Sequence, residues 1–220
     1  CEAEANELPK LHTRARKSTI LSEPLRSCLL GIPGAGKSHC FDLLRKFFED
    51  CLDWKHGVQF QFLATQNSMA ELIGGNTVHS WAGISQARQA AGSKNNSKDG
   101  DHDQLFENCI SMRWILIDEA STLSPGLLAT LESYLRKACL QHPYAFRKNG
   151  RVKERPFGGM NIIFAGDLWQ LPPVKDVALF SNPSVKKDGE RYDQGEQYIF
   201  SMFWNCNERT NENRIHRLFE

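Results

Sequence analysis

The sequence has no long hydrophobic run, no clustered cysteines and almost no net charge. No apolar stretch approaches the roughly 18 residues that a membrane-spanning helix needs, so no membrane span is predicted. Residues 1–7 are acidic and lack an apolar core, which is typical neither of a secretory signal nor of a transit peptide. A formal net charge of +1 gives no argument for nucleic-acid binding by the whole chain, so any such surface must be local.

The cysteines point to a reducing compartment. There are seven of them, scattered along the chain, with no Cys-x-x-Cys pair and no clustered histidines. An odd, scattered set argues against a disulfide framework and against a zinc site. Reduced thiols in an intracellular protein are the simplest interpretation.

A glycine-rich stretch is the most informative feature that is present. Residues 31–38 read Gly-Ile-Pro-Gly-Ala-Gly-Lys-Ser, which fits the phosphate-loop pattern of Gly, any four residues, Gly-Lys, and Ser or Thr. Glycines leave room for several backbone N–H groups to approach a polyphosphate. The apolar residues at 27–30 predict a strand before the loop, and helical spacing predicts a helix over 38–50. The loop then lies at a helix N-terminus, where the dipole favours an anion.

The phosphate loop predicts the nucleotide contacts. Lys37 is expected to reach the outer phosphates, and the Ser38 hydroxyl is expected to hold Mg²⁺. The full set of predicted nucleotide-binding residues is Gly31, Gly34, Ala35, Gly36, Lys37 and Ser38. A glycine-rich turn that binds nothing is the alternative, and the predicted strand and helix on either side disfavour it.

A second predicted strand ends in two acids. Residues 114–117 are apolar and run into Asp118 and Glu119. Charge at the end of a buried strand is costly, and two solvent-facing acids are the alternative interpretation. In a magnesium nucleotide site, one carboxylate holds the metal's water shell while its neighbour orients an attacking water. We therefore predict that this pair of acids serves a metal ion and an attacking water.

Strands and helices alternate along the chain. Further strands are predicted at 58–65 and 160–165, helices at 68–73, at 105–109 and after Ser124-Pro125, and a turn at 74–76. The helix after Ser124 carries a predicted buried stripe made of Leu127, Leu128, Leu131, Leu135 and Cys139. This alternation predicts an α/β fold with a doubly wound, mostly parallel sheet and a ligand at the carboxyl edge of its strands.

Composition divides the chain into three parts. Residues 1–26 predict a polar, mobile leader, residues 27–180 hold the patterned domain, and residues 181–220 form a divergent tail with weak patterning. Within the domain, residues 90–103 predict a flexible surface loop. Five basic residues at 147–155 predict either a solvated loop or a surface that faces a phosphate backbone.

Four segments together carry a family resemblance. They read Gly-Ile-Pro-Gly-Ala-Gly-Lys-Ser at 31–38, Gly-Asn-Thr-Val-His-Ser-Trp-Ala-Gly-Ile at 75–84, Ile-Leu-Ile-Asp-Glu-Ala-Ser at 115–121, and Pro-Phe-Gly-Gly-Met-Asn-Ile-Ile-Phe-Ala-Gly-Asp-Leu-Trp-Gln-Leu-Pro-Pro-Val at 156–174. In this order they resemble the PIF (petite integration frequency) family of superfamily 1 DNA helicases. The resemblance covers residues 27–180 and implies a RecA-like phosphate-loop ATPase domain that uses ATP and Mg²⁺.

The resemblance also implies residue roles. Gln170 matches the glutamine that senses the γ-phosphate, beside Asp118 at the metal and Glu119 as the base. The residues that match DNA-facing segments are Thr65, Thr77, His79, Ser80 and Trp81. Trp81 is a candidate for base stacking, which tolerates any sequence, with burial in the core as the alternative. Residues 65–70 depart from the family's Thr-Gly-x-Ala-Ala segment.

This resemblance implies the function of an ATP-dependent DNA helicase that acts in repair, recombination and telomere or genome maintenance. It implies single-stranded DNA or DNA junctions as partners, a monomer, and an intracellular location with the nucleus favoured over the mitochondrion. The second RecA-like domain and its arginine are not evident, and residues 208–210 only faintly resemble its entry. We therefore expect a fragment with weak hydrolysis on its own.

Other functions remain open from the sequence. A RecD-like or mobile-element helicase module is an alternative in the same class. A degenerate nucleotide-binding module without hydrolysis is another. The intact Lys37, Ser38, Asp118, Glu119 and Gln170 disfavour it, whereas the altered segment at Gln66 and the second domain that is not evident favour it. A small-molecule kinase would not need the Gly-Asp-x-x-Gln-Leu-Pro-Pro segment at 166–173.

Overall fold

The computed structural model describes residues 24–84, 102–140, 142, 145–147, 153–167, 169–173, 176–179 and 194–204. Residues 1–23 of the predicted leader and residues 90–101 of the predicted loop lie outside this part. Residues 181–193 and 205–220 of the tail also lie outside it.

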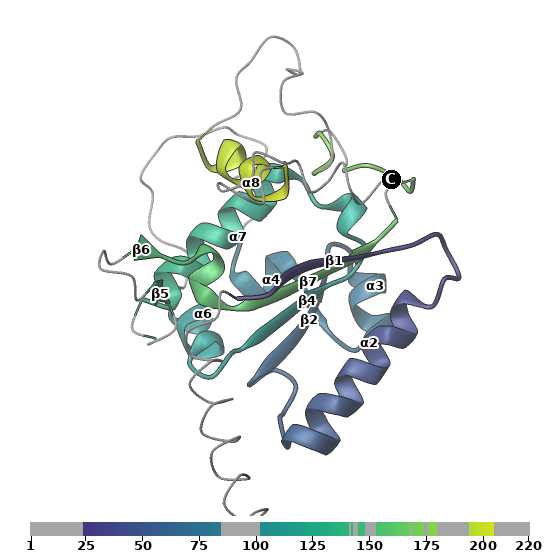
Figure 1. The fold of residues 1–220 in the computed structure, drawn as a ribbon, viewed down its shortest axis with the longest axis horizontal. Coiled ribbons are helices and arrows are strands. Elements are labelled where there is room, and N and C mark those ends of the chain that lie inside the picture. Colours follow the sequence, from purple (N-terminus) through teal and green to yellow (C-terminus); the bar gives the residue numbers. More distant parts are fainter. Residues whose placement is uncertain are drawn as a thin grey trace, which may run out of the picture.

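Five parallel strands form one sheet, as the alternation of elements predicts (Figure 1). In spatial order they are β1 (Arg26–Leu30), β7 (Asn161–Gly166), β4 (Trp114–Ile117), β2 (Phe60–Ala64) and β3 (Asn76–Thr77). Because every neighbouring pair is parallel, all five strands end at one edge of the sheet. The predicted turn at 74–76 extends one residue too far, since Asn76 pairs with Leu63 in the sheet.

Side chains of the central strands alternate between two cores. In β4, Ile115 and Ile117 join one core and Leu116 joins the other. In β7, Phe164 lies in the first core and Ala165 in the second. Successive side chains of a strand point to opposite faces. Both faces are buried, which explains why the sequence shows continuous apolar runs instead of alternation with polar residues.

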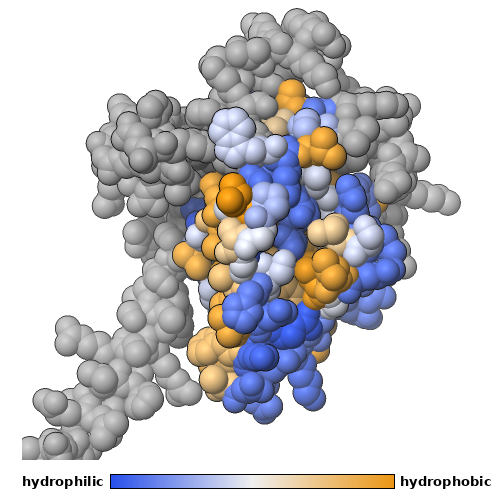
Figure 2. Space-filling view, turned by 90° about the vertical axis from the view of Figure 1, so that its right-hand side faces the viewer, coloured by the Kyte–Doolittle hydropathy of each residue, from blue (hydrophilic) through white to orange (hydrophobic). Residues whose placement is uncertain are grey.

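One face of the sheet is covered by α2 (Lys37–Lys46) and a π-helical turn that continues it, Phe47–Cys51. Phe41 and Phe48 from this element pack on Phe62 and Phe60, with ring centroids 5.4 and 4.9 Å apart. The helix predicted over 38–50 is confirmed by α2 and the π-helical turn together. The surface on this side of the molecule is mainly hydrophilic with separate hydrophobic patches (Figure 2).

A short helix, α3 (Asn67–Leu72), lies between β2 and β3 in the chain. Arg45 of α2 donates from Nη2 to the Ile73 carbonyl at 2.5 Å, which joins the two helices. The guanidinium of Arg45 also stacks over the Phe62 ring, 4.6 Å from its centroid.

The opposite face is covered by α4 (Val78–Ala82), α6 (His102–Cys109), α7 (Pro125–Ala138) and α8 (Gln194–Trp204) (Figure 1). The predicted stripe of α7 is confirmed, since all five of its members are buried. Ser124 caps this helix by accepting a hydrogen bond from the Leu127 N–H at 3.2 Å. No helix within the described ranges is long and apolar enough to cross a membrane.

Two segments differ from the sequence interpretation. The tail from 181 onward was expected to be weakly patterned, yet residues 194–204 form α8, which packs on α7 and buries Ile199 fully. The basic segment at 147–155 contains a short antiparallel pair, β5 (Phe146–Arg147) and β6 (Lys153–Glu154). Arg155 at its end is only 5% exposed, so this residue is not part of a solvated basic surface.

Gly158 allows the turn of 3-10 helix at Pro156–Gly159 to pack against α7. Its φ is +62°, and an added Cβ would lie 2.5 Å from the Cys139 Cβ. We expect Gly158→Ala to lower the free energy of unfolding by roughly 2–4 kcal/mol, from the left-handed backbone and the overpacking together. Gly57→Ala is the matched control, because Gly57 has φ +81° but its nearest neighbour lies 4.0 Å away. It should cost about 1 kcal/mol. Equal losses in urea denaturation would contradict the packing argument.

His56 makes stability depend on pH. Its Nε2 accepts a hydrogen bond from the Phe62 N–H at 3.2 Å. Burial and then the Arg45 charge lower the His56 pKa from 6.5 to about 4. Between pH 6.5 and about 4, His56 is therefore protonated in the unfolded chain but neutral in the folded protein. The free energy of unfolding falls as pH drops through this range. We expect His56→Gln to lose less stability over this range, measured by urea denaturation at each pH. Parallel pH profiles for the two proteins would reject the assignment.

Candidate active site

The predicted phosphate loop connects the end of β1 to the start of α2. The Gly31 N–H donates to the Gly166 carbonyl at 3.2 Å, so the pairing of β1 with β7 continues into the loop. Gly34 and Gly36 have φ of +78° and +86°, with no atom within 4 Å of the position of an added Cβ. These glycines are therefore required by the backbone conformation, and the space above them is open.

The N-terminus of α2 is free to bind an anion. Gly36 is its N-cap, no side chain caps it, and its first turn holds no acidic residue. The first N–H groups of a helix have no acceptor within the helix. Together with the positive end of the helix dipole, they form a site that favours phosphate.

Lys37 is folded over the loop. Its Nζ donates to the carbonyl oxygens of Gly31 and Ile32, at 2.7 and 3.2 Å. Its charge also lowers the pKa of both Asp118 and Glu119, against the effect of burial. The ammonium group is thus positioned near both the loop and the two carboxylates.

Asp118 and Glu119 follow β4 at the same edge. The Asp118 N–H donates to the Leu63 carbonyl at 2.8 Å, and the side chain is only 4% exposed. Burial raises the pKa of Asp118, while the Glu119 N–H, which donates to its Oδ1 at 2.9 Å, acts in the opposite direction. Burial and the charges of Asp118 and Asp167 raise the pKa of Glu119. The structure therefore brings the predicted pair together with Lys37.

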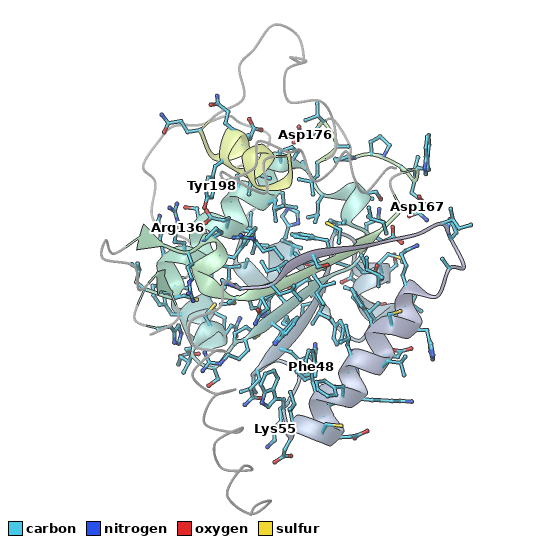
Figure 3. The ribbon with its side chains drawn as sticks, viewed as in Figure 1. Phe48, Lys55, Arg136, Asp167, Asp176 and Tyr198 are labelled. Carbon is cyan, nitrogen blue, oxygen red and sulfur yellow. The ribbon has the colours of Figure 1, made fainter. Side chains whose placement is uncertain are left out.

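Asp167 and Gln170 complete this edge after β7. Asp167 is 4% exposed and lies beside the loop that joins β1 to α2 (Figure 3). Its Oδ1 accepts from the Trp169 N–H at 3.0 Å, and its carbonyl accepts from the Gln170 N–H at 3.1 Å. Asp167 was missed as a site residue. The available signal was its position directly after a buried strand, the same as that of Asp118.

The residues present fit a magnesium ion. Ser38 lies in the first turn of α2 and supplies a hydroxyl, while Asp118 supplies a carboxylate. Both are oxygen ligands of the kind that Mg²⁺ prefers. Asp118 is a buried acid with a raised pKa, and a bound cation would offset the cost of its charge.

The predicted DNA-facing residues lie on the other half of the same edge, after β2 and β3. Thr65 follows β2, and its hydroxyl is hydrogen-bonded to that of Thr122. Thr77 ends β3 and caps α4 by accepting from the Ser80 N–H at 3.1 Å. Ser80 is exposed. Both ring nitrogens of His79 are buried and have no partner among the described residues.

Trp81 is not available for base stacking in this structure. It is 7% exposed and belongs to the core shared by α4, α6 and α7. Val78, Trp81 and Ala82 are spaced so that they share the inner face of α4. The structure supports the core alternative for this residue.

The sequence of this chain matches a known family of helicases. Residues 13–182 match the profile of PIF1-like helicases. The ATP-dependent DNA helicase PIF1 of Saccharomyces cerevisiae is 38% identical over 112 residues, which are 46% of this chain and 10% of the relative. The ATP-dependent DNA helicase Pif1 of Bdellovibrio bacteriovorus is 32% identical over 146 residues, which are 66% of this chain and 29% of the relative.

Solved structures share the fold. The Pif1 helicase from Bacteroides in complex with ADP-AlF3 and ssDNA aligns with a TM-score of 0.51 and 24% identity. The alignment covers 88% of this chain and 36% of that one. The chain thus spans about a third of this structure and a smaller share of the two curated relatives above. Because the family profile covers most of its length, the chain belongs to the PIF1-like helicase family.

Proposed function

We propose that this chain is the first motor domain of an ATP-dependent DNA helicase and that the described edge of the sheet binds and hydrolyses ATP. The observation that carries the proposal is the arrangement of Lys37 between an uncapped helix N-terminus and two acids, the buried Asp118 and the half-buried Glu119. This arrangement offers donors for phosphates and carboxylates for a metal and a water. Family membership supports the same assignment.

Lys37 and the loop act on the phosphates. The N–H groups at the start of α2 receive the anionic chain, and Lys37 exchanges its two carbonyl acceptors, Gly31 and Ile32, for phosphate oxygens. The free loop is therefore already paired with its own lysine. Part of the free energy gained from nucleotide binding is therefore spent on breaking these two hydrogen bonds.

Glu119 and Gln170 act on the water and the γ-phosphate. Glu119 accepts a proton from the attacking water, and its raised pKa moves it closer to the pH at which a general base works well. Ser38 and Asp118 would hold Mg²⁺, which neutralises charge on the phosphates when bound. Gln170, fixed through its backbone to Asp167, reads the presence of the γ-phosphate.

The DNA strand is proposed to bind along the ends of β2 and β3, at Thr65, Thr77, His79 and Ser80. The exposed hydroxyl of Ser80 and the half-buried hydroxyls of Thr65 and Thr77 suit contacts to phosphate and sugar, which carry no sequence information. A motor that travels along any strand needs contacts of this type. Single-stranded DNA and DNA junctions are the proposed substrates, and the Bacteroides relative is described in complex with ssDNA.

Movement along DNA requires more than the described domain. Translocation is driven by two domains that open and close around the nucleotide, and this chain spans 36% of its Bacteroides relative. We propose that the complete helicase unwinds DNA in repair, recombination and telomere maintenance. A protein with this role acts on intracellular DNA, with the nucleus favoured over the mitochondrion.

The hydrolysis proposal is tested by steady-state ATP turnover with Mg²⁺, with and without single-stranded DNA. We expect Lys37→Ala to weaken nucleotide binding and to abolish turnover. Glu119→Gln should retain ATP binding and lose at least about 100-fold in turnover, because only the proton acceptor is removed. Glu107→Gln, at an exposed position on α6, is the matched control and should behave like the parent. Nucleotide binding without any turnover in the parent would support a module that has lost hydrolysis.

The DNA-binding proposal is tested by fluorescence anisotropy with labelled single-stranded DNA. Ser80→Asp places a negative charge on the exposed start of α4 and should weaken binding about tenfold through repulsion of phosphate. Ser111→Asp adds the same charge before β4, at the amino edge of the sheet, and should leave affinity unchanged. If both variants lose affinity equally, the effect is one of net charge and the proposed binding edge is wrong.

A further inference from the structure

The hydroxyl of Thr122 connects two strand ends. Thr122 is the last residue of a turn of 3-10 helix, Ala120–Thr122, that follows the two acids. Its Oγ1 donates to the Glu119 carbonyl at 2.8 Å and is also hydrogen-bonded to Thr65 Oγ1. A threonine hydroxyl has one proton to donate. Because Thr122 gives its proton to Glu119, Thr65 must donate to Thr122, and the two bonds form a directed chain.

This chain of bonds ends at a strained residue. Glu119 has φ +52° and ψ +46°, a left-handed conformation that costs a residue with a Cβ about 1–2 kcal/mol. The Glu119 carbonyl accepts both the Thr122 N–H, at 3.0 Å, and the Thr122 hydroxyl. These two bonds hold the backbone that carries the Glu119 carboxylate. Loss of the hydroxyl removes one of them.

The turn is also fixed from the side of β7. An added Cβ on Gly166 would lie 3.0 Å from the Ala120 nitrogen and 3.3 Å from the Ser121 nitrogen. The turn is therefore packed against β7 on one side and hydrogen-bonded to Thr65, after β2, on the other. Its position is therefore set by contacts to both strand ends.

We propose that Thr122 is a positioning residue that holds Glu119 for catalysis and couples it, through Thr65, to the DNA-facing end of β2. The inference rests on the proposed ATPase function. A strand of DNA that moves Thr65 changes the hydrogen bond to Thr122, and Thr122 passes the change to the backbone of Glu119. A residue of this kind affects turnover more than nucleotide affinity.

A neighbouring hydroxyl supplies the matched control. Ser121 lies in the same turn and is fully buried, but its Oγ has no hydrogen-bond partner among the described residues. Ser121→Ala therefore removes a buried hydroxyl without breaking a bond. Thr122→Val keeps the shape of the side chain and removes the hydroxyl, whereas Thr122→Ser keeps the hydroxyl.

The catalytic part is tested by kcat and KM for ATP with Mg²⁺. We expect Thr122→Val to lower kcat on the order of tenfold with KM within about twofold of the parent. Thr122→Ser should restore most of kcat, and Ser121→Ala should match the parent. An unchanged kcat in Thr122→Val, or an equal loss in Ser121→Ala, would overturn the proposal.

The coupling part is tested without hydrolysis, by hydrogen exchange at the amides of residues 122 and 123. We expect Thr65→Val and Thr122→Val each to speed exchange on the order of tenfold, although position 65 is 57 residues from position 122. Ser121→Ala should leave exchange at these amides unchanged. An unchanged exchange rate at these two amides in Thr65→Val would reject the coupling. If both threonine variants speed exchange as expected but the parent protein shows no ATP turnover, the hydrogen-bond coupling is retained and the proposed ATPase function of this chain is rejected.

Discussion

The parallel pairing of β1 with β7 is the interaction on which the whole site depends. The ladder runs from Arg26 and Ile162 to Leu30 and Gly166 and then continues through the Gly31 N–H into the phosphate loop. Because β7 also pairs with β4, segments that are more than a hundred residues apart end at the same edge. A slip of one residue in this register would turn every side chain of the strand to the other face. The two buried cores prevent such a slip, and so they also fix the geometry of the site.

The site itself is electrostatically costly. Glu119 lies within the electrostatic reach of two other acids, Asp118 and Asp167, and of the ammonium group of Lys37. Burial raises the pKa of Asp118 and Glu119, which means that the folded state gives up free energy to keep them charged. The apolar cores on both faces of the sheet supply the stability that offsets this cost. A bound cation would relieve part of this cost, because it brings positive charge to the carboxylates.

The sequence predicted the sheet, the phosphate loop and the acids because each depends on local patterns. Apolar runs mark buried strands, and glycine spacing marks the loop. The sequence did not decide whether Trp81 is buried or stacks on a DNA base, since the five residues of α4 are too few to reveal which face is inward. It missed α8, where Ile199 is buried by packing on α7, a contact made far along the chain. It also missed Thr122, whose importance comes from a hydrogen bond to a residue on another strand.

The edge of the sheet is divided between two kinds of residue. The proposed nucleotide residues lie at the ends of β1, β4 and β7, and the proposed DNA residues lie at the ends of β2 and β3, so any coupling must cross from β2 to β4. Among the described residues, the backbone bond from Asp118 to Leu63 and the hydroxyl bond between Thr65 and Thr122 both cross there. The backbone bond extends a rigid ladder. A bond between two half-buried hydroxyls is worth only about 1 kcal/mol net and can be exchanged for water or phosphate. The hydroxyl bond is therefore the weaker of the two contacts, and it is the one to which our proposal assigns the coupling.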